Sequence, residues 1–128
     1  MKKCDLTITT TADGVENSIT RKGEIELFVT SATVRYTEEN AAVCIRLEGE
    51  RAVIERQGDY SMRLELESGK RRFGTLGING AEGEIETFTE RIQYSIGKDS
   101  LLLSLRYDLL VGDEPQKMKI RLFAKIHE

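Results

Sequence analysis

The chain has 128 residues, of which 39% are hydrophobic and 32% charged, and its formal net charge is −3 at pH 7. This size and composition predict one globular domain over residues 1–128 and exclude a disordered chain. The longest apolar runs, such as Leu101-Leu102-Leu103, are far shorter than the ~20 residues of a membrane-spanning helix. The mild negative charge argues against nucleic acid as the main partner. We therefore expect that the protein binds neither a membrane nor a nucleic acid.

The first strands are predicted by apolar residues that alternate with polar ones, because successive side chains of a strand point to opposite faces. In chain order the apolar members are Cys4, Leu6 and Ile8; then Ile25, Leu27 and Val29; then Val34 and Tyr36; then Val43, Ile45 and Leu47; then Ala52 and Ile54. Turn residues separate these groups, and Asp13-Gly14 and Gly58-Asp59 are typical examples.

The second half continues the pattern, with one weak stretch. The apolar positions are Tyr60, Met62, Leu64 and Leu66; then Phe88, Ile92, Tyr94 and Ile96; then Leu101, Leu103, Leu105, Tyr107 and Leu109; then Met118, Ile120, Leu122, Ala124 and Ile126. From Phe73 to Gly83 the alternation fades. The only proline, Pro115, stands at the start of a strand, where its missing N–H does no harm.

Together these signals predict an all-β fold. No segment carries a helical apolar stripe, and turn signals recur about every 8–14 residues. One apolar face per strand suits one continuous interior, so we predict a single antiparallel β-barrel of the calycin or lipocalin type with about 8–10 strands. Leu64, Leu103, Leu105, Ile92 and Ile120 are expected to be buried in it.

Few residues suggest chemistry. Cys4 and Cys44 lack metal-site spacing and are expected to be free thiols on opposite faces of the barrel wall. His127 is the only histidine, which argues against a histidine-based triad and most zinc sites. The start at Met1-Lys2-Lys3 has no apolar stretch behind it, so we expect a cytoplasmic protein rather than a secreted one. We predict no catalytic residue, metal or cofactor, and no enzymatic activity.

Gly74, Gly77, Gly80 and Gly83 recur every three residues. A glycine-rich loop can present backbone N–H groups to a phosphate. This stretch lacks the GxGxxG pattern and a following helix, so a flexible hairpin loop is the favoured interpretation. Such a loop could still cover a barrel mouth.

Two charged residues stand at positions that strict alternation assigns to the apolar face of their strands. Glu90 is in register with Ile92 and Tyr94, and Arg56 is in register with Ile54. If both point inward, they pair with each other or hold a polar ligand, because an unpaired buried charge is costly. A bulge would turn either one to solvent, and this solvent-facing or purely structural role is the favoured alternative.

Two basic clusters could serve as an anion or RNA surface. They comprise Lys117, Lys119, Arg121 and Lys125 on the last strand, and Lys70-Arg71-Arg72. Acidic outer faces, among them Glu65 and Glu67, offer cross-strand partners instead. We therefore interpret these clusters as solvated, cross-paired surface, and the carboxylates at 38–39 and 82–86 as solubilising charge.

Three stretches resemble a known family: 54–70, with an Arg-x-Gly turn, 87–92 with its two threonines, and 103–109 with a Leu-x-Tyr strand. They are similar to the YwiB-like family of small bacterial proteins, which is grouped with calycin-like barrels. The family's aromatic-x-Thr-Pro-aromatic-Gly turn is replaced here by Phe73-Gly74-Thr75-Leu76-Gly77, without the proline. The resemblance implies a barrel and a bacterial cytosolic setting, and it implies no activity.

The leading hypothesis is a non-enzymatic barrel that binds a small molecule in its interior or mouth. Its candidate ligand-binding residues are Arg56, Glu90, Tyr94 and Tyr107. The alternative is a protein-interaction or structural module that acts through its outer surface, as a monomer or homodimer. A deep pocket favours the first, whereas a filled interior with an exposed apolar patch favours the second.

Overall fold

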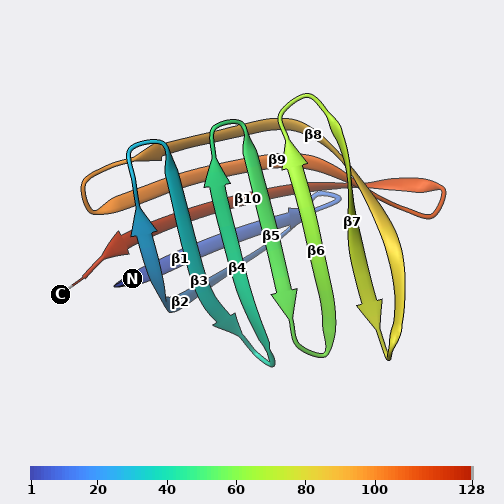
Figure 1. The fold of residues 1–128 in the computed structure, drawn as a ribbon, viewed down its shortest axis with the longest axis horizontal. Helices are drawn as coiled ribbons and strands as arrows, with labels where there is room; N and C mark the ends of the chain where they lie inside the picture. Colours follow the sequence, from blue (N-terminus) through green and yellow to red (C-terminus); the bar gives the residue numbers. More distant parts are fainter. Residues whose placement is uncertain (128) are drawn as a thin grey trace.

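The computed structural model describes residues 1–127, and its secondary structure is entirely β (Figure 1). Ten strands form one closed antiparallel barrel, in which each strand pairs with its neighbours in sequence and β1 pairs with β10. They are β1 (Lys2–Ala12), β2 (Val15–Leu27), β3 (Ser31–Glu38), β4 (Ala41–Glu48), β5 (Arg51–Gln57), β6 (Tyr60–Glu67), β7 (Arg71–Ile78), β8 (Ala81–Ile96), β9 (Ser100–Val111) and β10 (Glu114–Ile126). The predicted antiparallel barrel is confirmed.

The barrel is built from two layers that cross. Strands β3 to β7 run side by side across β8, β9, β10 and β1 (Figure 1). The two long strands β2 and β8 belong to both layers, since β2 pairs with β1 and then β3, and β8 with β7 and then β9. A strand that turns such a corner needs a break in its regular geometry.

Each corner has its own break. In β8 the register shifts between Thr89 and Arg91, which is a β-bulge at Glu90. In β2 the corner lies at Gly23, where an added Cβ would stand 2.4 Å from the Arg35 carbonyl oxygen and 2.7 Å from Leu6 Cδ1. Only a residue without a side chain allows this close approach. The strand β2 passes through this glycine unbroken.

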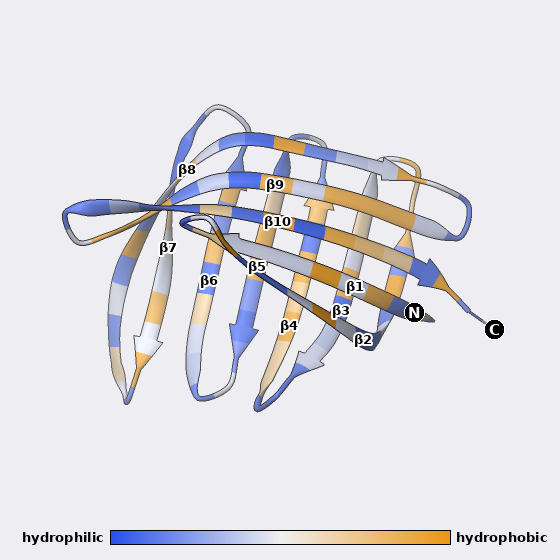
Figure 2. Ribbon diagram, turned by 180° about the vertical axis from the view of Figure 1, so that it is seen from behind, coloured by the Kyte–Doolittle hydropathy of each residue, from blue (hydrophilic) through white to orange (hydrophobic). Residues whose placement is uncertain are grey.

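The barrel interior is a packed apolar core. Alternate residues of the strands are buried in the interior and the others are exposed, and hydrophobic and hydrophilic residues vary along each strand accordingly (Figure 2). The predicted core residues Leu64, Leu103 and Leu105 are fully buried, while Ile92 and Ile120 are partly buried and pack against the same cluster. The largest fully buried apolar side chains are Leu6, Ile25, Val34, Ile45, Leu47, Leu64, Leu66, Leu101, Leu103, Leu105 and Leu122.

Two stretches differ from the prediction. The predicted flexible loop at 73–83 is a regular hairpin, in which Asn79 and Gly80 have φ of 52° and 80° and form a two-residue turn. Alternation fades there because Gly74 occupies a strand position where a Cβ would lie 2.0 Å from the Arg63 carbonyl oxygen. Val29, predicted to continue a strand face, lies in the β2–β3 loop and is almost fully exposed.

Among residues 1–127 there is no helix of the length and apolar character that crossing a membrane would require.

Candidate functional site

Tyr94, a predicted ligand-binding residue, lies at one end of the barrel. Its hydroxyl donates a hydrogen bond of 2.7 Å to the Gly49 carbonyl oxygen in the β4–β5 turn, and a longer one of 3.4 Å to the Thr30 carbonyl oxygen. Tyr94 therefore ties β8 to two turns across this end, and its hydroxyl is engaged by backbone.

Arg56 lies at the other end of the barrel, at an inward position of β5, which is the less favoured of the two orientations considered from the sequence. Its guanidinium pairs with Asp59 at 2.9 Å and with Glu38 at 3.4 Å, and it donates to the Tyr60 carbonyl oxygen at 2.9 Å. It also lies 3.8 Å from the centre of the Tyr60 ring. The hydrogen bond from Arg56 lowers the pKa of the Asp59 carboxyl. Glu38, interpreted from the sequence as solubilising charge, is in fact a partner of this arginine.

Tyr107 is buried near Tyr36 at the end of the barrel that holds Arg56. Burial raises the pKa of both hydroxyls, and for Tyr36 the charges of Glu38 and Tyr107 add to the effect. Arg56, Tyr36 and Tyr107 thus lie at the same end of the barrel as Glu38. Of the four predicted site residues, Arg56 and Tyr107 lie at this end and Tyr94 lies at the opposite one.

Glu90 does not point inward, and the possible Arg56–Glu90 pair does not exist. The bulge at Glu90 shifts the phase of β8, so that Ile85, Thr87 and Thr89 face the interior before it and Ile92 and Tyr94 after it. Glu90 is exposed, as is Phe88. A bulge adds one residue to one strand, and strict alternation across it must fail.

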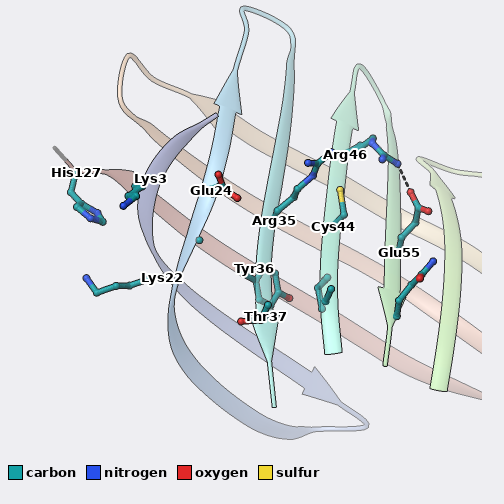
Figure 3. A pocket seen from close by; sticks show the side chains of 14 residues that line it. Lys3, Lys22, Glu24, Arg35, Tyr36, Thr37, Cys44, Arg46, Glu55 and His127 are labelled. Carbon is teal, nitrogen blue, oxygen red and sulfur yellow. Dashed lines mark hydrogen bonds and ion pairs between the residues drawn. The ribbon is translucent and has the colours of Figure 1, made fainter. Parts of the chain in front are cut away.

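The structure has a groove on its outer surface, over β1 to β5. Its volume is about 690 Å³, within the range of small-molecule sites. Figure 3 shows His127, Lys3 and Lys22 at one side of it, and Arg35, Cys44 and Arg46 at the other. The strand residues named here are at outward-facing positions, whereas Tyr36 and Val43, which also line the groove, face the barrel interior.

Cationic side chains dominate the groove. Its lining holds four of them, Lys3, Lys22, Arg35 and Arg46, against the two carboxylates Glu24 and Glu55. Arg46 pairs with Glu55, and Lys22 pairs with Asp5 at 3.1 Å. Within residues 1–127, Lys3 and Arg35 form no ion pair, although Glu24 lies opposite both in the strand register. The lining is thus positive in a chain whose net charge is negative.

The groove lies where β2 turns its corner. Gly23 lines the groove, and because it has no side chain the backbone of β2 lies close to Leu6 and Tyr36. Lys22 and Glu24 flank this glycine and project to the outside. The same residue therefore lies both at the corner of β2 and in the lining of the groove.

The two cysteines are free and lie on opposite sides of the wall, as predicted. Cys4 is fully buried, and burial raises the pKa of its thiol. Cys44 is partly exposed and lines the groove beside Arg35 and Arg46 (Figure 3). No group of three or more metal-ligating side chains gathers within residues 1–127.

The basic cluster at 70–72 is neutralised by its neighbours. Arg72, Lys70 and Arg51 converge on Glu67, and Arg71 pairs with Glu86 at 2.9 Å. The hydrogen bond from Arg72, followed by that from Lys70, lowers the pKa of Glu67 to about 2. On the last strand, Lys125 pairs with Asp99 at 3.1 Å. The cluster at 70–72 and Lys125 thus agree with the cross-paired surface that the sequence favoured, whereas Lys117, Lys119 and Arg121 form no ion pair within residues 1–127.

A family model described as a domain of unknown function (DUF1934) matches residues 4–122. The chain belongs to the DUF1934 family. No curated protein matches the sequence. The crystal structure of the ywiB protein from Bacillus subtilis is similar to this DUF1934 chain, with a TM-score of 0.84 and 17% identity over 99% of this chain and 93% of that one.

These matches confirm the resemblance to the YwiB-like family that the sequence indicated. At 17% identity the structural likeness shows the barrel fold alone. For this DUF1934 member, an argument about function therefore has to come from its own surface.

Proposed function

We propose that this chain is a non-catalytic binding module that holds a small anionic molecule, a carboxylate or a phosphate, in the groove over β1 to β5. The observation that carries the proposal is the excess of cationic side chains around a hollow of about 690 Å³. Arginine and lysine are the side chains that recognise such anions, through charge-assisted hydrogen bonds.

Arg35 is the residue on which the proposal depends most. It is exposed, it lines the groove, and within residues 1–127 its guanidinium has no ion-pair partner. Arg46, in contrast, is already engaged by Glu55. An anion in the groove would bind the donors of Arg35 and Lys3 directly and would be attracted by the other two cations at longer range.

The outer groove is a better place for a ligand than the barrel interior. Side chains from all sides of the barrel meet in one packed cluster on its axis. The inward Arg56 at the barrel end is already held by Glu38 and by the exposed Asp59. A ligand there would have to displace contacts that the chain already makes.

A non-catalytic role is supported by the position of the only histidine. His127, the only histidine, lines the groove 3.3 Å from Asp5, on the side away from Cys44 (Figure 3). Nucleophilic catalysis requires a base within hydrogen-bond reach of the nucleophile. The groove is thus equipped to attract and hold an anion.

The proposal is tested by NMR titration of the ¹⁵N-labelled protein with inorganic pyrophosphate, with glycerol as the neutral control. We expect saturable shifts of backbone amides around Gly23, Arg35 and Cys44 with pyrophosphate only, weakened by salt because the attraction is electrostatic. Arg35→Gln should weaken the affinity about tenfold, which corresponds to about 1.4 kcal/mol. The matched variant Arg121→Gln, on another face, should leave it unchanged. Shifts spread evenly over the surface, or an Arg35→Gln variant that binds equally well, would contradict the proposal.

A further inference from the structure

The outer face of the other layer carries a row without charge. In the strand register, Thr20, Thr7, Phe123, Leu102 and Ser95 stand side by side on β2, β1, β10, β9 and β8. The next row along these strands is Ser18, Thr9, Arg121, Ser104 and Gln93, with one charged member. Figure 2 looks onto this layer. In a chain with 32% charged residues, ten neighbouring positions with one charge form an unusual surface.

The centre of this face is apolar and exposed. Leu102 and Phe123 are direct cross-strand neighbours, and 54% and 46% of their surfaces are accessible. Few charged residues and a central aromatic side chain are typical of the middle of a protein–protein interface. We call the ten residues of the two rows the β9–β10 face.

We propose that the β9–β10 face binds the same face of a second copy of this chain, as a two-fold symmetric dimer. The order of the first row carries this inference, because it is nearly the same when read in reverse: hydroxyl residues flank the apolar pair on both sides. A two-fold axis that runs between β9 and β10, along the strands, places Phe123 on Leu102 of the partner subunit and the reverse. A self-complementary patch is what an isologous interface requires.

Within the two rows, the same operation places the remaining side chains on compatible partners, whereas in the row beyond Arg121 it brings Lys119 opposite Arg106 of the partner subunit. Thr7 comes opposite Ser95 of the partner subunit, and Arg121 opposite Ser104 of the partner subunit, so like charges do not meet in the two rows. At one border, Lys125 of one copy approaches Asp99 of the partner subunit. These two residues already pair within one chain at 3.1 Å, and a second pair of the same kind forms across the axis.

The area of the face predicts a weak dimer. Five strands about 4.8 Å apart and two rows about 7 Å apart cover roughly 300–400 Å² per copy. A stable complex of standard size buries about 800 Å² per partner. We therefore expect monomers at low micromolar concentration and dimers as the concentration approaches the millimolar range.

Sedimentation velocity from about 10 μM to about 1 mM tests the proposal. The natural chain should shift from the monomer toward the dimer across this range, and Phe123→Ser should remain a monomer throughout. Phe28→Ser is the matched control, since Phe28 is also exposed but lies in the β2–β3 loop, and it should dimerise like the natural chain. A natural chain that stays monomeric, or a Phe123→Ser variant that dimerises normally, would overturn the proposal.

The orientation of the two copies is tested by a pair of charge variants. Lys125→Asp and Asp99→Lys each place like charges at both positions, so each alone should dimerise less than the natural chain. In an equimolar mixture the two variants face each other with opposite charges, and the mixture should dimerise more than either variant alone. A mixture that behaves as the average of its components would overturn the two-fold arrangement.

Discussion

The hydroxyl of Tyr94 donates a hydrogen bond of 2.7 Å to the carbonyl oxygen of Gly49, which joins β8 to the β4–β5 turn across one end of the barrel. These two residues lie in different layers of the fold, so the bond holds the layers together at a point where no strand pairing does. Tyr94 was a candidate ligand-binding residue, and its geometry is that of a structural tie.

Tyr94→Phe removes this bond and keeps the ring in place. We expect the free energy of unfolding to fall by about 1 kcal/mol, the usual net contribution of one such hydrogen bond. Urea unfolding followed by circular dichroism measures it. A change within about 0.2 kcal/mol of zero would show that the tie contributes nothing in solution.

Arg56→Met should destabilise the barrel by about 1–3 kcal/mol, because Glu38 and Asp59 lose their cation and the Tyr60 carbonyl loses a donor. Glu90→Gln should change the stability by less than about 0.5 kcal/mol, since Glu90 is an exposed bulge residue. The two values come from the same chemical unfolding experiment. Equal, large effects for both variants would mean that the bulge is misplaced and that Glu90 faces the interior.

Sequence alternation predicted most of the fold for a simple physical reason. A barrel with one interior requires every strand to present one apolar face. Alternation along the strands is therefore enough to predict that Leu103, Leu105 and Leu64 are buried. The prediction failed at Glu90, because an inserted residue inverts the parity of everything before it. It failed again at Gly74, where a close approach between strands replaces the expected side chain with a glycine.

The groove was not predicted because its residues do not form a motif. Lys3, Arg35 and Arg46 each occupy an ordinary polar position on the outside of a strand. They meet only through the register of β1 to β4. If the register of the consecutive strands had been known, the sequence would have placed Lys3, Glu24, Arg35 and Cys44 in one row across the sheet.

Two buried threonines provide a matched pair of variants. Thr87 Oγ1 donates to the Glu65 carbonyl oxygen at 2.9 Å, whereas Thr89 Oγ1 has no hydrogen-bond partner among residues 1–127. Thr87→Val should therefore lower the free energy of unfolding by about 1 kcal/mol, because it removes a hydrogen bond. Thr89→Val should raise the free energy of unfolding by about 1 kcal/mol, because it removes an unsatisfied buried hydroxyl. Equal losses for both variants in thermal or chemical unfolding would contradict this difference.

The pairing of Glu67 with Arg72, Lys70 and Arg51 predicts a specific acid sensitivity. Its pKa falls from an ordinary value of 4.5 to about 2 in the folded state. Between these values the unfolded chain binds more protons, so the stability that this carboxylate contributes is present above pH 4.5 and is lost as the pH falls toward 2. Glu67→Gln should melt at a lower temperature than the natural chain at pH 6, and the difference should disappear near pH 2. A difference that is the same at every pH would refute a role for this ionisation.

The anion groove contains its own reporter, the thiol of Cys44, because Cys4 is buried and slow to react. The most direct test compares the rates at which this thiol reacts with Ellman's reagent, a dianionic disulfide, and with the neutral disulfide 4,4′-dithiodipyridine. The quantity measured is the rate with the dianionic reagent divided by the rate with the neutral one. At low salt this ratio should be about tenfold higher for Cys44 in a cationic groove than for a small free thiol. The ratio should fall on addition of salt, of inorganic pyrophosphate, or of the substitution Arg35→Gln. A ratio of the two rates equal to that of a small free thiol, and unchanged by salt and by pyrophosphate, would contradict the proposal that this groove binds anions.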